Sequence, residues 1–448
     1  MKGGWTERKP GFEHLVDEIE REILARPGIL RTGKVVEVIG TLVKVGGLDV
    51  SMGELCELRT SAGTLLQYAE VIGFTRDCAL LSPFSMLRGI SRSTRVIGLG
   101  RSLAVKVGDM LLGRVINSLG DPVDGGPDIE SDTFQPVFAS PPEPMSRRII
   151  DTPVITGVRV VDAMMTLAEG QRMGVFAPAG VGKSTLLGMF ARGTDCDINV
   201  IALIGERGRE VREFVELILG PAGMARSVVV CATSDRSPME RAKAAYVATA
   251  IAEYFRDRGL RVLLMMDSLT RFARAGREIG LAAGEPPARR GFPPSIFAEL
   301  PRLLERAGMG ATGSITGIYT VLAEDESGND PVAEEVRGIL DGHMILSREI
   351  AARHQYPAID VLGSLSRVMS QVMPASYIDA AAHVRALMAK YREIEMLLQI
   401  GEYKAGANVL ADEAIARYDE INAFLSQRTD EIIELADTEA WLYALNAA

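Results

Sequence analysis

The sequence lacks any apolar run close to the roughly 18 residues of a membrane-spanning helix, and its longest candidates, such as VLLMM at 262–266, are strand-sized. The first ten residues, MKGGWTERKP, contain no apolar stretch that could act as a signal peptide. Only four cysteines occur, none in a C-x-x-C spacing, so neither a disulfide framework nor a zinc site is expected. We therefore expect a cytoplasmic protein with buried thiols.

Proline-rich, glutamine-rich and repetitive tracts are also missing, and the 448 residues are 47% hydrophobic and 24% charged. Such a composition is typical of a globular chain, and the length suggests about three domains. The net charge of −10 argues against a nucleic-acid partner. From residue 371 onwards the chain has 13 acidic and 6 basic residues, and this negative charge indicates either a solvated helical surface or a docking site.

The patterning divides the chain into three predicted domains, 1–97, 98–370 and 371–448. A short helix over 12–26 precedes closely spaced alternating segments, which predict a small β-barrel. The second domain alternates apolar strands with helical stretches, which predicts an α/β fold with a parallel sheet covered on both faces. Long amphipathic runs, including LADEAIARYDEINAFLSQRTDEIIELAD at 410–437, predict a helical last domain.

A phosphate-binding loop is predicted where A-P-A-G-V-G-K-S stands between the strand MGVF and an apolar helical run. Backbone N–H groups at such a helix start cradle phosphates, while Lys183 reaches the β and γ oxygens and the hydroxyl of Ser184 holds Mg²⁺. The strict pattern has Gly where Ala177 stands, and the alternative is a glycine-rich turn with an incidental lysine. The residues predicted to bind ATP are Ala177, Pro178, Ala179, Gly180, Val181, Gly182, Lys183, Ser184 and Thr185.

Two carboxylates follow apolar strands of the same predicted sheet. Asp267 ends RVLLMMD and would face the crevice at the carboxyl end of the strand, where its carboxylate could bind Mg²⁺ directly or through its water ligands. Apolar strands that end in Asp are common, however, so this motif alone is weak. Glu206 follows NVIALIG and could align or deprotonate an attacking water. Its alternative role is as a member of a surface charge cluster at a helix start.

Three further side chains are candidates for the same chemistry. Phosphoryl transfer is accelerated by a cation near the charge that develops in the transition state, and Arg271 or Arg367 could supply it. Arg367 lies in a loop-like stretch, YPAIDVLGSLSRV, that could reach a neighbouring subunit. Tyr356 in this stretch could stack on a base. The alternatives are solvated arginines and a packed core tyrosine.

These strings together resemble one family over nearly the whole chain, the ATPases that share the fold of rotary ATP synthase catalytic subunits. The signature-like segment PAIDVLGSLS and the segment GRVINSLGDPVDG carry the resemblance. It implies a P-loop NTPase core of the RecA/rotary ATPase type. By position it further implies that Glu206 is the catalytic carboxylate, that Arg207 supports the γ-phosphate, and that Tyr356 stacks on adenine. Arg367 would be a finger donated across a subunit interface.

Within this family, strings such as LIGERGREVREF, FPPSIFAELPRLLERAG and EMLLQIGEYKAG resemble the flagellar and type III secretion export ATPases, and the last resembles injectisome members. The acidic DELSEED-type string of synthase subunits is missing. The resemblance implies a homohexamer that releases and unfolds chaperone-bound substrates beneath an inner-membrane export gate, peripheral to that membrane. Stalk and stator-type regulator proteins would be its other partners.

Three alternatives remain open. A flagellar export ATPase would have the same chemistry and different clients. A non-catalytic hexamer component would bind nucleotide without hydrolysing it, but it would not need Glu206 beside an intact phosphate loop. An RNA-translocating ring would need a basic or aromatic surface in the barrel, which the sequence does not show.

Overall fold

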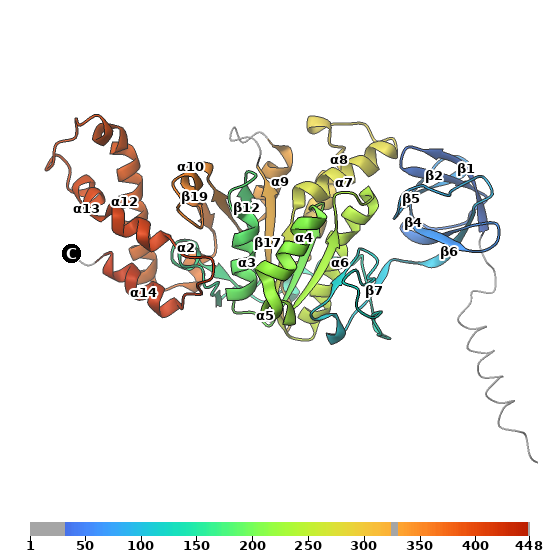
Figure 1. The fold of residues 1–448 in the computed structure, drawn as a ribbon, viewed down its shortest axis with the longest axis horizontal. Coiled ribbons are helices and arrows are strands. Elements are labelled where there is room, and N and C mark those ends of the chain that lie inside the picture. The colour runs from blue at the N-terminus through green and yellow to red at the C-terminus, as the bar shows by residue number, and fades with distance from the viewer. Residues whose placement is uncertain (1–31, 324–329, 447–448) are drawn as a thin grey trace, which may run out of the picture. The chain divides into compact units, whose positions relative to one another are not determined.

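The computed structural model describes residues 32–323 and 330–446, which form two compact units. The first comprises residues 32–83 and 87–102, and the second comprises residues 84–86 and 103–446 (Figure 1). The helix expected over 12–26 lies outside the described residues. Within the described ranges, no helix is both long enough and apolar enough to cross a bilayer.

The first unit is a closed barrel of six antiparallel strands in the order β1-β2-β5-β4-β3-β6, as the alternating pattern predicts. Its inward-facing side chains form a separate apolar core that includes Val43, Cys56, Leu58 and Leu81. The strands are β1 (Thr32–Ile39), β2 (Leu42–Gly46), β3 (Glu54–Arg59), β4 (Leu65–Phe74), β5 (Cys78–Pro83) and β6 (Arg95–Ser102).

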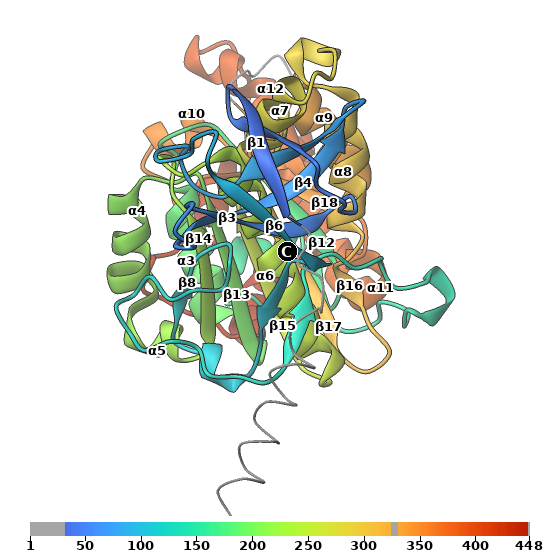
Figure 2. The same cartoon turned by 90° about the vertical axis from the view of Figure 1, so that its right-hand side faces the viewer.

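The second unit is built on a nine-stranded sheet in the order β19-β18-β12-β17-β15-β13-β14-β8, with β16 paired to β17. All neighbours pair in parallel except β18 with β19 and β16 with β17, which are antiparallel. Figure 2 shows β14, β13, β15 and β17 side by side. The strands are β8 (Val115–Ile116), β12 (Arg172–Ala177), β13 (Ile198–Ile204), β14 (Ser227–Ala232), β15 (Arg261–Asp267), β16 (Gly308–Met309), β17 (Ser314–Leu322), β18 (Gly342–Leu346) and β19 (Ile359–Ser366).

Helices cover this sheet, and β13 is buried at every position as expected for a strand covered on both faces. The longest covering helix, α6, packs against β13, β14 and β15. The helices are α2 (Arg159–Met164), α3 (Lys183–Gly193), α4 (Gly208–Glu213), α5 (Gly220–Ala225), α6 (Pro238–Asp257), α7 (Leu269–Ala282), α8 (Pro294–Leu304), α9 (Pro331–Ile339), α10 (Arg348–Ala352), α11 (Met369–Val372), α12 (Ala375–Gln399), α13 (Val409–Leu425) and α14 (Leu435–Ala444). Two short strand pairs, β7 (Ala104–Lys106) with β9 (Phe134–Pro136) and β10 (Pro153–Val154) with β11 (Leu167–Ala168), complete the unit.

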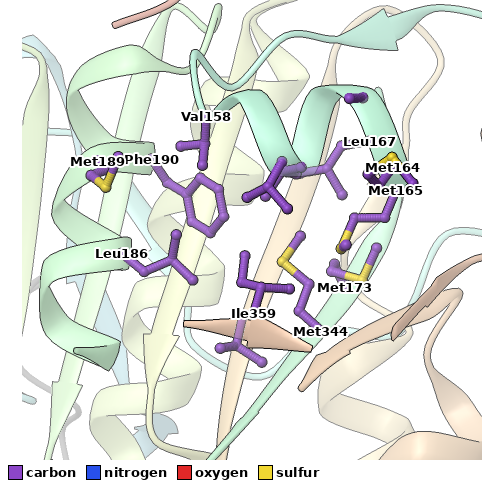
Figure 3. Packing of buried hydrophobic residues seen from close by; sticks show 14 of the residues in the cluster. Val158, Met164, Met165, Leu167, Met173, Leu186, Met189, Phe190, Met344 and Ile359 are labelled. Atoms are coloured by element: carbon purple, nitrogen blue, oxygen red, sulfur yellow. The ribbon is translucent and has the colours of Figure 1, made fainter. Parts of the chain in front are cut away.

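An apolar cluster fixes the helix that follows the glycine-rich loop. Leu186 and Phe190 of α3 are buried in the same core as Met173, Met344 and Ile359 of β12, β18 and β19 (Figure 3). Burial of each large apolar side chain contributes about 1.5–3 kcal/mol. The N-terminus of α3 is therefore held rigidly relative to the sheet.

Two segments differ from the sequence-based expectation. The stretch 356–368 was expected to be loop-like, but β19 within it pairs with β18 at the edge of the sheet. The run 410–437 is not one helix, because α13 ends at Leu425 and α14 begins at Leu435. Gln427 explains the break, since it is buried and its side-chain amide donates to the carbonyl oxygens of Gly157 and Glu431 at 2.8 and 3.0 Å. Contacts with the sheet domain thus outweigh helical periodicity here.

The helical stretch that follows β13 is irregular. After α4 the chain continues as a π-helical segment over Phe214–Leu219. One of its carbonyl oxygens, that of Ile218, accepts a hydrogen bond from Arg192 of α3. The segment is therefore attached to the helix that follows the glycine-rich loop.

The four cysteines are free, and only Cys56 is fully buried, whereas the other three are partly exposed. Burial raises the pKa of Cys196 and Cys231 to about 11. These two thiols are therefore protonated and weakly nucleophilic at neutral pH.

A buried ion pair joins α6 to the chain after α8 and provides a test of the packing. Arg306 donates to both carboxylate oxygens of Glu253 at 2.9 and 2.5 Å, and their side chains are only 1% and 3% exposed. We expect Glu253→Ala to lower the free energy of unfolding by about 3–5 kcal/mol, because it leaves a buried guanidinium without its carboxylate. Chemical denaturation measures this difference.

A matched control is Glu216→Ala, which removes an exposed ion pair with Arg212. This change is expected to cost at most about 0.5 kcal/mol. Equal losses in the two variants would contradict a structural role for the buried pair.

Candidate active site

Three segments meet at the carboxyl edge of the large sheet. The glycine-rich loop 178–182 follows β12, Glu206 lies just beyond β13, and Asp267 is the last residue of β15. Because β12, β17, β15 and β13 are adjacent parallel strands, their carboxyl ends lie along one edge. The residues predicted from three separate motifs therefore lie together.

The loop after β12 has the backbone conformation that its glycines permit. Gly180 and Gly182 have φ values of +83° and +89°, in the left-handed region that strongly favours glycine. Gly182 is the N-cap of α3, so the unpaired amide N–H groups of the first turn open into the loop. Ala177 is buried as the last residue of β12, where ordinary strand conformation requires no glycine.

Lys183, the first residue of α3, lies between two carboxylates. Its Nζ contacts Oδ1 of Asp267 and lies 3.8 Å from Oε1 of Glu206. The hydroxyl of Thr320 in β17 donates to the same Asp267 oxygen at 2.8 Å. Since one ammonium faces two carboxylates, the cluster suits a further cation.

Glu206 is partly buried and faces charged groups from three elements. Burial, and after it the charge of Asp267, raise the pKa of Glu206 to about 7, against the lowering effect of Lys183 and Arg271. The Nε atom of Arg271 lies 3.6 Å from the Glu206 Oε1 atom. A side chain at Gly205 would come within 2.7 Å of Arg271, so glycine is needed for this close approach. The carboxyl is thus poised to exchange a proton near neutral pH.

Unpaired polar atoms in this cluster fit a magnesium-bound nucleotide. Glu206 Oε1 and Arg271 Nε are buried and have no hydrogen-bond partner among the described residues. Ser184, the second residue of α3, is exposed beside Lys183. Within the described ranges, no cluster of three or more His, Cys, Asp or Glu side chains could hold a metal alone. A hydroxyl and one carboxylate are nevertheless sufficient protein ligands for Mg²⁺, which usually keeps several waters and binds phosphates.

A cavity of about 320 Å³ lies beside the glycine-rich loop. Tyr356, Pro357 and Leu346 line it together with loop residues, and Tyr356 is 38% exposed. The Tyr356 ring lies about 3.6 Å from the position that a side chain at Gly182 would take. An aromatic face next to a phosphate loop suits a nucleobase.

Two predicted residues lie apart from the cluster. The side chain of Arg207 is 76% exposed and pairs with Glu210 at 2.6 Å. Arg367 follows β19, is exposed, and makes no side-chain hydrogen bond or ion pair with any residue that the structure describes. Within one chain, neither completes the group around Lys183.

Sequence reasoning missed three residues near this site. Thr320 had a weak signal, as a hydroxyl in the otherwise largely apolar strand SITGIYTVL. Gln427 and Thr429 line the cavity beside Tyr356, although they lie in the C-terminal segment after α13. No local pattern connects these two with the loop, because tertiary folding alone brings them there.

Comparison with family models divides the chain into three matches. Residues 35–100 match the beta-barrel domain of the ATP synthase alpha/beta family, and residues 157–366 match the nucleotide-binding domain of that family. Residues 373–444 match the T3SS EscN ATPase C-terminal domain.

Similar proteins extend over nearly the whole chain. The type 3 secretion system ATPase of Xanthomonas euvesicatoria is 70% identical over 94% of this chain and 95% of its own length. The flagellum-specific ATP synthase of Bacillus subtilis (strain 168) is 49% identical over 93% and 95%. The assembled ATPase EscN of enteropathogenic E. coli superposes with a TM-score of 0.88 at 45% identity, covering 93% of this chain and all of that one. The chain therefore belongs to the type 3 secretion system ATPases, within the ATP synthase alpha/beta family.

Proposed function

We propose that this chain hydrolyses ATP in sites shared between the subunits of a homohexamer and couples hydrolysis to type III protein secretion. The observation that carries the proposal is the cluster of Lys183, Asp267 and Glu206 beside the glycine-rich loop, in which buried polar atoms make no hydrogen bond to any described residue. Identity of 70% to a type 3 secretion system ATPase supports the coupling to secretion.

Each residue of the site has a proposed task. The loop amides and Lys183 bind the phosphates, and Tyr356 stacks on adenine. Glu206 orients the attacking water and accepts its proton, so that the oxygen attacks the γ-phosphate in line. Mg²⁺, held by Ser184 and Asp267, would neutralise charge on the β and γ phosphates.

Three arginines complete the proposed site for phosphoryl transfer. Arg271 lies beside Glu206 and stabilises charge near the γ-phosphate, and Arg207 supports this region from the start of α4. Arg367 acts in the neighbouring subunit's site, which agrees with its exposed and unpaired side chain among the described residues. A solved EscN is described as assembled, which supports the shared site.

The proposed partners follow from the family. A solved EscN is in complex with its central stalk, EscO, and we propose an equivalent stalk here. A stator-type regulator, an export-gate membrane protein and chaperone–effector complexes are the other proposed partners, with the C-terminal helices contacting the clients. The chain would act in the cytoplasm, peripheral to the inner membrane.

A flagellar export role is the second candidate, because flagellum-specific relatives are 48–49% identical to this chain. The chemistry would be the same and the clients would differ. The 70% identity to a type 3 secretion system ATPase favours secretion.

We expect Glu206→Gln to lower turnover by about 10²–10⁴-fold while ATP binding persists, because the loop and Lys183 still hold the phosphates. Steady-state hydrolysis and titration with a fluorescent ATP analogue measure the two effects. Glu213→Gln, on the exposed face of α4, is the control and should turn over like the wild type. Near-normal turnover in the Glu206 variant would remove this residue from its role.

The pH dependence of kcat/KM provides a second test. The value should fall as the pH drops through about 7, because only the ionised Glu206 carboxylate can accept a proton. Hydrolysis assays across this range, with the mass of the assembly checked at each pH, measure the profile. A flat profile with an intact assembly would contradict the proton-accepting role.

The shared site predicts a dependence on concentration. Hydrolysis per subunit should fall when dilution dissociates the hexamer, whereas Arg367→Ala should assemble but lose about 10³-fold or more in kcat. Hydrolysis and mass are measured together over a dilution series of both proteins. Constant hydrolysis per subunit in the monomer would exclude a shared site.

A further inference from the structure

The edge strand β19 contains an unusual bulge between Tyr356 and Arg367. Its first half pairs Ile359 with Leu346, and its second half pairs Ser366 with Gly342. Between the halves the register shifts, so that residues 361–364 face the single residue Met344. A bulge of this kind redirects the strand that follows it, and here that strand leads directly to Arg367.

Side chains within the bulge define its shape. The Asp360 carboxylate accepts the backbone N–H groups of Leu362 and Gly363 at 3.1 and 3.2 Å. The Ser364 hydroxyl donates to the Asp360 carbonyl oxygen at 2.6 Å and accepts from the N–H group of Ile345 at 2.9 Å. Residues 361–364 have no ladder partner on β18.

Arg385 of the C-terminal helix α12 caps two carbonyl oxygens of the bulge. Its guanidinium donates to the oxygens of Val361 and Ser364 at 2.5 and 3.4 Å, and to that of Met164, the last residue of α2, at 2.6 Å. Among the described residues, no carboxylate lies within ion-pair distance of this side chain. Burying an arginine that bonds only to carbonyl oxygens costs desolvation energy. We therefore expect its role to be structural: it fixes the positions of the carbonyl oxygens that it binds.

Further hydrogen bonds hold the chain between the bulge and Arg367. The Ser366 hydroxyl accepts from Gln171 at 3.0 Å and donates to the Thr166 carbonyl oxygen at 2.9 Å. The backbone N–H of Arg367 donates to the Asp341 carbonyl oxygen at 3.0 Å. The backbone is therefore fixed where the exposed side chain of Arg367 leaves the surface.

We infer that Arg385 is a positioning residue for Arg367, through which the C-terminal helical region sets the competence of the neighbouring subunit's site. The inference rests on the proposed function, in which Arg367 acts across the interface. Arg385 and the hydrogen bonds of Ser366 and Arg367 hold this segment jointly, so loss of the caps on Val361 and Ser364 lets the bulge relax and displaces the end of β19. Phosphoryl transfer tolerates such a shift poorly, because the arginine must lie at the developing charge.

The experiment compares Arg385→Leu with wild type in the full-length hexamer. We expect kcat to fall about tenfold or more, with the hexamer mass and the affinity for a fluorescent ATP analogue unchanged, since the subunit's own loop and base cavity are intact. Arg392→Leu, at an exposed arginine on the same helix, is the matched control and should keep wild-type kcat.

Two further variants separate positioning from simple loss of structure. Arg385→Lys retains the charge but cannot cap all three carbonyl oxygens at once, so an intermediate kcat is expected. The double variant Arg385→Leu/Arg367→Ala should be no slower than Arg367→Ala alone, because both changes remove the same contribution, that of a correctly placed Arg367 to kcat. Multiplicative losses, or a weakened affinity for the nucleotide analogue, would overturn the inference.

Failure of the inference can be distinguished from failure of the proposed function. Normal kcat in Arg367→Ala would refute the shared site itself. A slow Arg367→Ala beside a normal Arg385→Leu would overturn only the positioning role of Arg385.

Discussion

The contact of Lys183 with two carboxylates depends on the parallel sheet that brings them together. Each residue lies at or just beyond the end of a different strand, and the parallel strands β12, β15 and β13 place their carboxyl ends at one edge. Lys183 and Arg271 lie within ion-pair distance of Glu206 Oε1, but this atom accepts no hydrogen bond among the described residues. A bound phosphate with its cation would supply hydrogen-bond and charge partners to these groups.

The same sheet connects the site to the C-terminal helices. Tyr356 precedes β19 and Arg367 follows it, so one edge strand joins the proposed base cavity to the proposed intersubunit arginine. Two residues of the C-terminal region contact this segment: the backbone N–H of Gln427, after α13, donates to the Tyr356 carbonyl oxygen at 2.8 Å, and Arg385 of α12 caps the bulge within β19.

The sequence predicted the fold class and the residues around Lys183 because their signals are local: a glycine-rich loop before a helix, and carboxylates at the ends of apolar strands. It did not predict β19, whose bulge hides any alternation, or the end of α13 at Leu425. Those features depend on Gln427 and Arg385, whose bonds reach residues more than twenty positions away. Single-sequence periodicity contains no record of such distant partners.

The most direct test of the shared site is complementation between two inactive variants. When Arg367→Ala and Glu206→Gln subunits are mixed in equal amounts and reassembled, about one quarter of the sites combine an intact Glu206 with an intact Arg367 from the neighbour. Hydrolysis measured in the mixed hexamers should then recover to roughly a quarter of the wild-type rate. A mixture that stays as inactive as its components would contradict the account.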